Sequence, residues 1–100
     1  MTISRVEMDV PAAQGVRLTD DSLEVQLSDG RSVVVPLQWF PRLLHATTGE
    51  RERWRLIGDG QGIHWEMLDE DVSVGALLVG RPSMESQSSF KRWLEARATT

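Results

Sequence analysis

The chain has 100 residues with 15 acidic and 11 basic side chains, a formal net charge of −4, 40% hydrophobic residues and no cysteine. That length fits about one soluble globular domain. The acidic balance argues against a general nucleic-acid binder, which needs many Lys and Arg on phosphates, and the lack of cysteine excludes disulfides, thiolate metal sites and cysteine nucleophiles.

The first third of the chain is predicted to form a short N-terminal strand followed by a β-hairpin. Small and turn residues at 11–15 indicate a loop after that first strand. Apolar and polar residues then alternate from Ser22 to Ser28, as in a half-buried strand, and Arg31 to Val35 is the returning strand.

The register of this hairpin follows from the apolar pattern. A three-residue loop at 28–30, with Gly30 in the left-handed conformation, sets Val25 opposite Val33 and Leu23 opposite Val35. A two-residue loop would set Val25 opposite Val34 and turn Val33 and Val35 to the polar face, because a slip of one residue flips a strand. We therefore expect the three-residue loop.

The middle of the chain is predicted to contain a helix and a second hairpin. Residues Gln38 to Ala46 form the expected helix, with a proline in its first turn, and a charged helical turn follows at 50–53. Strands Trp54 to Ile57 and Ile63 to Trp65 flank a glycine-rich turn and form the second hairpin.

The last part of the chain begins with an acidic turn at Asp69–Asp71. Ser73 is expected to cap a short helix that runs through Leu78. The final helix is predicted to start at Pro82–Ser83 and to carry an apolar stripe that includes Trp93.

The element order predicts an α+β fold: two antiparallel β-hairpins with an intervening helix and C-terminal helices packed on the sheet. We expect a single domain over residues 1–100. Within it, residues 1–15 are the N-terminal strand and loop, 16–80 the α+β core, and 81–100 the C-terminal helix and tail. No apolar run reaches the ~18–20 residues of a membrane span, and no signal-peptide core is visible, so we expect a cytoplasmic protein.

The acidic run Asp69, Glu70 and Asp71 is open to two interpretations. Hard cations need several oxygens that converge from a shaped loop, whereas adjacent residues in a turn splay apart. We therefore expect an acidic contact surface and no bound metal or cofactor. The same charges lie near the N-terminus of the helix at Ser73, where the helix dipole favours them.

The two histidines are not expected to be catalytic. His64 alternates with the apolar residues around it and is predicted to meet Glu66 on the polar face of its strand. No nucleophile signature accompanies His64 or His45. We therefore expect no catalytic residues and no enzymatic activity.

Aromatic and Arg residues supply the candidate partner contacts. Four Trp in 100 residues are more than a small domain buries easily. Trp and Arg are enriched in interface hot spots, so Trp39, Arg42 and Trp54 are candidate interface residues, with core packing as the alternative.

Several short motifs over residues 15–97 match a pattern seen in one bacterial family. They are Asp29-Gly30-Arg31, the run from Pro36 to Leu43, Arg51 with Trp54, Gly62 to Trp65, and Leu68 to Ser73. Together they resemble the uncharacterised family called domain of unknown function 2442. The resemblance implies a small α+β domain without established enzymatic activity. It also implies a link to toxin–antitoxin-like gene pairs, because many members of the family are similar to the product of the second gene of such a pair. Some members carry a helix-turn-helix domain, for which the residues after Gly80 are too few.

We therefore expect a non-enzymatic, antitoxin-like protein–protein interaction module that neutralises a partner protein, with a toxin from a neighbouring gene as candidate. Asp69, Glu70 and Asp71 would pair with basic residues of the partner, while Trp39 and Arg42 anchor the contact. The alternative is a transcriptional regulator or accessory subunit that contacts DNA only as an oligomer or in a complex. A homodimer stays open, and neither direct nucleic-acid binding nor a membrane partner is expected.

Overall fold

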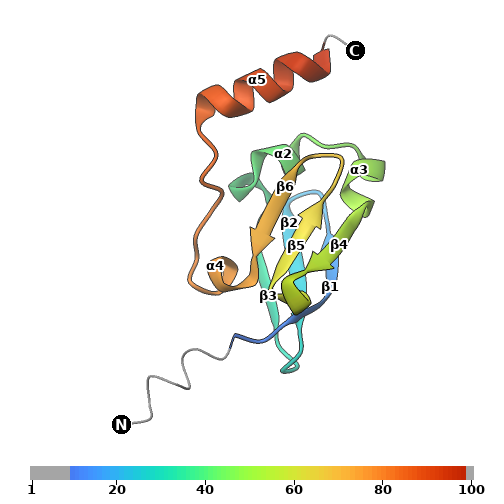
Figure 1. The fold of residues 1–100 in the computed structure, drawn as a ribbon, viewed down its shortest axis with the longest axis vertical. Helices are drawn as coiled ribbons and strands as arrows, with labels where there is room; N and C mark the ends of the chain where they lie inside the picture. Colours follow the sequence, from blue (N-terminus) through green and yellow to red (C-terminus); the bar gives the residue numbers. More distant parts are fainter. Residues whose placement is uncertain (1–9, 99–100) are drawn as a thin grey trace.

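The computed structural model describes residues 10–98, so the N-terminal strand expected before residue 10 lies outside the described residues. Two three-stranded antiparallel sheets and several short helices make up an α+β fold, as expected (Figure 1). Each predicted hairpin is present, and each gains a third strand at its edge.

Sheet A has the strand order β1-β2-β3, formed by Ala13–Leu18, Ser22–Leu27 and Ser32–Pro36. The loop predicted at 11–15 is wrong from residue 13 onward, because β1 begins there. An irregularity in the pairing between Ala13 and Gly15 breaks the two-residue alternation at the start of this strand.

The predicted register of the first hairpin is confirmed. Val25 pairs with Val33 and Leu23 with Val35. Gly30 has a φ of 93°, so it takes the left-handed conformation that the three-residue loop requires. This register turns β2 so that its apolar side chains are buried.

Sheet B has the order β4-β5-β6, formed by Trp54–Ile57, Gly62–Trp65 and Glu70–Ser73. The acidic turn predicted at 69–71 is wrong for two of its three residues, since Glu70 and Asp71 start β6. Asp69, with a φ of 50°, ends the turn that precedes the strand. Alternating burial along β6 points Glu70 and Val72 inward.

The helix predicted over 38–46 is interrupted. A 3₁₀ turn, η1 (Leu37–Trp39), is separated from α2 (Pro41–Leu44) by Phe40 at φ −128° and ψ 85°. A residue before proline is sterically pushed out of the helical region, so Pro41 starts a new helix rather than lying inside one. The next helix, α3 (Thr48–Glu52), begins earlier than predicted because Thr47 and Glu50 form a capping box.

The remaining helical segments are η2 (Gly58–Gly60), α4 (Val74–Leu78) and α5 (Gln87–Ala98). Ser73 caps α4 as predicted, with its hydroxyl accepting a hydrogen bond from the backbone N–H of Ala76. The final helix starts at Gln87, five residues after the predicted Pro82, and it lies over α2 and α3 rather than on a sheet (Figure 1). Within residues 10–98 no helix has the length and apolar character needed to cross a membrane.

The two sheets share one core. In Figure 1, sheet B lies in front of sheet A, and side chains from both sheets join a single buried cluster. The most deeply buried large side chains are Trp65, Leu23, Leu37, Leu43, Ile63, Leu68, Val25 and Val74. The edge strands β1 and β4 join this core through Ala13, Val16, Leu18 and Trp54.

Candidate functional site

An open cleft lies between the two sheets at one side of the molecule. It has a volume of about 320 Å³ and is lined by β1, the turn after it, α3 and the first residue of β4. The lining residues are Val16, Arg17, Leu18, Thr19, Asp20, Thr48, Arg51, Glu52 and Trp54. β1 and β4 are both edge strands, and Figure 1 shows them on the same side of the fold.

The segment that follows β4 closely approaches the start of β1, and we call this the closed end of the cleft. The end at Trp54 and α3 is the open end. At the closed end, η2 approaches the start of β1 so closely that a Cβ on Gly60 would lie 3.1 Å from the carbonyl oxygen of Ala13. At the open end, Trp54 and α3 face the last residues of β1 across the cleft.

Hydrogen bonds fix the α3 wall of the cleft. The guanidinium of Arg51 donates from Nε to the carbonyl of Leu43 (2.9 Å) and from Nη2 to that of Leu44 (2.8 Å). The indole N–H of Trp65 donates to the carbonyl of Arg51 at 3.0 Å. The wall is therefore tied both to α2 and to the core.

The rim of the cleft combines one aromatic side chain with charges of both signs. Trp54 is half-buried and packs against the core cluster. The side chain of Arg17 is 71% exposed and lies 3.6 Å from Glu24, while Asp20 and Glu52 are exposed. The cleft thus offers an apolar surface and a charged border, the usual composition of a protein contact.

A second cluster of functional groups forms around Arg42, on α2. Its Nε and Nη2 donate to the carboxylate of Glu85 at 2.9 and 2.6 Å, and its Nη1 donates to the carbonyl of Leu68 at 2.7 Å. This ion pair raises the pKa of Arg42 and lowers that of Glu85. Arg42 is therefore engaged by the chain's own C-terminal segment.

Glu70 is the buried acid of this cluster. It is only 9% exposed, and burial, followed by the negative charge of Glu85, raises its pKa to about 7. The positive charge of Arg42 opposes this shift but does not cancel it. Since β6 turns Glu70 inward, this carboxyl is not part of the exposed acidic surface.

The C-terminal helix docks beside this cluster through rings and charges. The guanidinium groups of Arg42 and Arg97 each lie over the ring of Trp93, at 5.4 and 4.5 Å from its centroid. Both Nη atoms of Arg97 donate to the carboxylate of Glu50, each at 2.9 Å. Together with the hydrogen bond from Thr47, Arg97 lowers the pKa of Glu50 to about 2.

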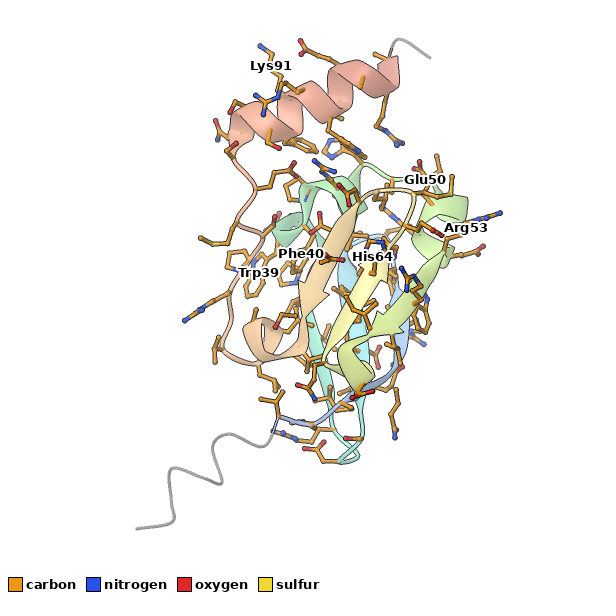
Figure 2. All side chains as sticks on the ribbon, viewed as in Figure 1. Trp39, Phe40, Glu50, Arg53, His64 and Lys91 are labelled. Carbon is orange, nitrogen blue, oxygen red and sulfur yellow. The ribbon has the colours of Figure 1, made fainter. Side chains whose placement is uncertain are left out.

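The outer face of sheet B carries a row of polar side chains, Arg55, His64 and Asp71, which are paired across the three strands. His64 Nδ1 contacts the carboxylate of Asp71, not that of Glu66 as the sequence suggested. Figure 2 shows His64 on the front face of this sheet. Across residues 10–98, no three His, Asp or Glu side chains gather closely enough to hold a metal ion.

The candidate residues predicted from the sequence do not form one surface. Asp69 and Glu70 lie close enough to Arg42 for their negative charges to help raise the pKa of its guanidinium. Trp39 lies beside the C-terminal segment, where its carbonyl accepts a hydrogen bond from the N–H of Ser83 at 2.9 Å (Figure 2). The other two candidates lie elsewhere: Trp54 lines the cleft, and Asp71 lies on the outer face of sheet B.

Sequence reasoning missed the β1 side of the cleft and the role of Glu85. The alternation Val16-Arg17-Leu18 is a strand signal that could have revealed β1. Nothing in the spacing of Glu85 indicates its contact with Arg42, because the two residues are 43 positions apart.

Comparisons with known proteins agree with this fold. A crystal structure of a protein of unknown function from Rhodospirillum rubrum ATCC 11170 has a TM-score of 0.67 and 26% identity, and covers 79% of this chain and 98% of that one. The solution NMR structure of an uncharacterised protein from Chromobacterium violaceum has a TM-score of 0.66 and 19% identity, and covers 91% of this chain and 84% of that one. No curated protein matches the sequence. The family "Protein of unknown function (DUF2442)" matches residues 13–83, and the chain belongs to this family.

Proposed function

We propose that this domain is a non-enzymatic, antitoxin-like protein-binding module whose cleft between β1 and β4 accepts an extended segment of a partner protein. The observation that carries the proposal is the meeting of two sheet edges at one open cleft beside Trp54. Residues on β1, α3 and β4 supply its walls, so the cleft is built by the fold and not by one loop.

Edge strands are suited to this role because one side of their backbone has no partner strand. In the described part of the chain, β1 pairs with β2 alone and β4 with β5 alone. An added strand can satisfy such backbone groups, while neighbouring pockets select its side chains. Charges such as Arg17 and Glu52 at the rim disfavour unspecific pairing of edges and favour a segment of complementary charge.

Trp54 supports the same assignment. A half-buried Trp gives a large contact area at small cost in side-chain entropy, and Trp residues dominate many interface hot spots. The net charge of −4 favours a basic partner over an acidic one. Both histidines contact groups other than a hydroxyl nucleophile: His64 contacts Asp71, and His45 Nδ1 lies 3.0 Å from the carbonyl of Pro41.

The experiment isolates the protein with its partner from the native host, using the product of the neighbouring gene as first candidate, and measures the affinity of the purified complex. Glu52→Lys reverses a charge at the cleft, and Glu66→Lys makes the same change at an exposed turn outside it. We expect Glu52→Lys to weaken binding about tenfold or more, equivalent to about 1.4 kcal/mol, and Glu66→Lys to leave it unchanged.

Two results contradict the proposal. One is the lack of any stoichiometric protein complex, and the other is a complex whose affinity is the same for Glu52→Lys and Glu66→Lys. DNA binding by the chain or its complex that weakens steeply with salt would instead favour the regulator alternative.

A further inference from the structure

The C-terminal segment, residues 83–98, docks on the α2–α3 surface through a small set of specific contacts. Two ion pairs hold its two ends: Glu85 binds Arg42, and Arg97 binds Glu50. Between them, Phe90 lies edge-on to His45 at a centroid distance of 5.1 Å.

This docking buries little of the helix. Every described side chain of α5 remains at least partly exposed. Its attachment rests on ion pairs and ring contacts together with Trp93, which is partly buried against the core cluster, so α5 contributes little buried apolar area. The family match ends at residue 83, so α5 lies outside the part of the chain that defines the family.

The connection to α5 has the features of a hinge. Gly80 has a φ of 75°, and residues 81–86 have neither helical nor strand structure. Two large apolar side chains are exposed at the hinge: Val79, which precedes it, at 66% and Met84, which lies within it, at 92%. Figure 1 shows this connection running along the outside of the fold before α5 begins.

The geometry points to an exchange of residues 83–98 between two copies of this chain, which gives a dimer in which each body holds its partner's C-terminal helix. The exchanged helix makes the same contacts in the dimer as in the monomer, so the exchange itself costs little. The two hinges run side by side in such a dimer, and their exposed Val79 and Met84 side chains can then cover one another.

A second copy is the occupant best matched to this surface. The α2–α3 surface presents a cation at Arg42 and an anion at Glu50, and the segment presents Glu85 and Arg97 in the complementary order. An unrelated helix would need the same two charges in the same order with an aromatic side chain between them.

The first test is the mass of the wild-type chain, measured by light scattering over a dilution series. We expect a dimer that dissociates on dilution. A chain that stays monomeric at its highest soluble concentration overturns the exchange.

The second test identifies the exchanged element by reversing charges. Glu50→Arg and Arg97→Glu each place like charges at the docking site of their own monomer. In a mixed dimer with exchanged helices, each body meets a helix of opposite charge, so both contacts are restored. After the two variants are unfolded and refolded together, native mass spectrometry should show a dimer with one chain of each kind.

Glu95→Arg is the matched control, because Glu95 is an exposed residue of the same helix. Mixing it with Glu50→Arg should give no enrichment of the mixed dimer. A dimer of the wild-type chain without preferential pairing of Glu50→Arg with Arg97→Glu means that the copies meet elsewhere, and this overturns the exchange. If a variant loses its far-UV circular dichroism, the wild-type dilution series remains the measurement that can overturn the exchange.

Discussion

Arg42 and Glu85 form an ion pair that joins α2 to the segment leading into α5, with Nη2 and Oε2 2.6 Å apart. Both side chains are largely shielded from water, at 16% and 11% exposure. Arg42 also donates to the carbonyl of Leu68, so one guanidinium holds together three separate parts of the chain.

Removal of this guanidinium should destabilise the fold. Arg42→Ala removes the donor to the Leu68 carbonyl and leaves the largely shielded Glu85 carboxylate with the Ser89 hydroxyl as a donor but without its cationic partner. We expect a loss of about 2–4 kcal/mol in the free energy of unfolding, measured by urea denaturation. Arg53→Ala removes an exposed Arg at the end of α3 and should change stability by less than about 0.5 kcal/mol. Equal effects of the two substitutions would contradict the role assigned to Arg42.

The raised pKa of Glu70 makes stability depend on pH near neutrality. Its pKa is about 7 in the fold, against an ordinary value of 4.5, because burial disfavours the charged form. Between these values the folded state binds more protons than the unfolded state, so this carboxyl reduces stability as pH rises from about 4.5 to 7. Glu70→Gln should remove that decline and stabilise the protein at pH 8 by about 1–3 kcal/mol.

The measurement for Glu70 is a series of urea unfolding curves across this pH range. Glu66→Gln, at an exposed neighbouring position, should leave the pH dependence of the wild type intact. A wild-type chain and a Glu70→Gln variant with parallel stability curves would falsify the assignment.

Local sequence patterns predicted the helices and strands, whereas contacts between residues distant in sequence determine how these helices and strands pack together. The Val25–Val33 register followed from alternation alone, because one buried face fixes it. Phe40 could have been recognised as a break, since it precedes a proline. Glu70 was misplaced because β6 is short and begins with acidic residues, so its alternation is visible only once the partner strand is known.

The candidate site was less accessible to sequence reasoning than the fold. Trp54 was identified from its residue type, and it does line the cleft. The opposite wall is β1, whose alternation is interrupted near Gly15, and no local signal brings β1 beside α3. Arg42 was also identified from its type, but its partner Glu85 is too distant in sequence for any spacing rule.

Acid should loosen α5 before it unfolds the body. The Arg97 guanidinium holds the pKa of Glu50 at about 2, below its ordinary value of 4.5. The stabilisation from this pair is therefore complete above about pH 4.5 and is lost as pH falls toward 2. We expect the indole NMR signal of Trp93, which lies against Arg97, to shift over that window while the signal of buried Trp65 does not.

Glu50→Gln is the control for this acid transition. It removes the titrating carboxyl while keeping a similar shape. The Trp93 signal of this variant should therefore lose the part of its shift that is caused by protonation of Glu50. A wild-type Trp93 signal that stays constant between pH 4.5 and pH 2 would mean that the Glu50–Arg97 pair does not hold the helix.

Gly60 should be the glycine least tolerant of substitution among three that can be compared directly. Its φ is +85°, and an added Cβ would lie 2.8 Å from the Cβ of Ala12 and 3.1 Å from the carbonyl oxygen of Ala13. Gly60→Ala therefore combines backbone strain with a clash at the closed end of the cleft, and we expect a loss of about 2–4 kcal/mol.

The other two glycines separate strain from contact. Gly30 has a φ of +93° with nothing near its Cβ, so Gly30→Ala should cost about 1–2 kcal/mol from strain alone. Gly49 lies in α3 with open space around it, so Gly49→Ala should stabilise by up to about 1 kcal/mol. The free energy of unfolding in urea should be highest for Gly49→Ala, lower for Gly30→Ala and lowest for Gly60→Ala. Because Gly60, unlike Gly30, lies where η2 approaches β1, its variant should also weaken binding of a partner in the cleft, whereas Gly30→Ala should not. Equal affinities for the two variants would show that the closed end does not set the width of the cleft.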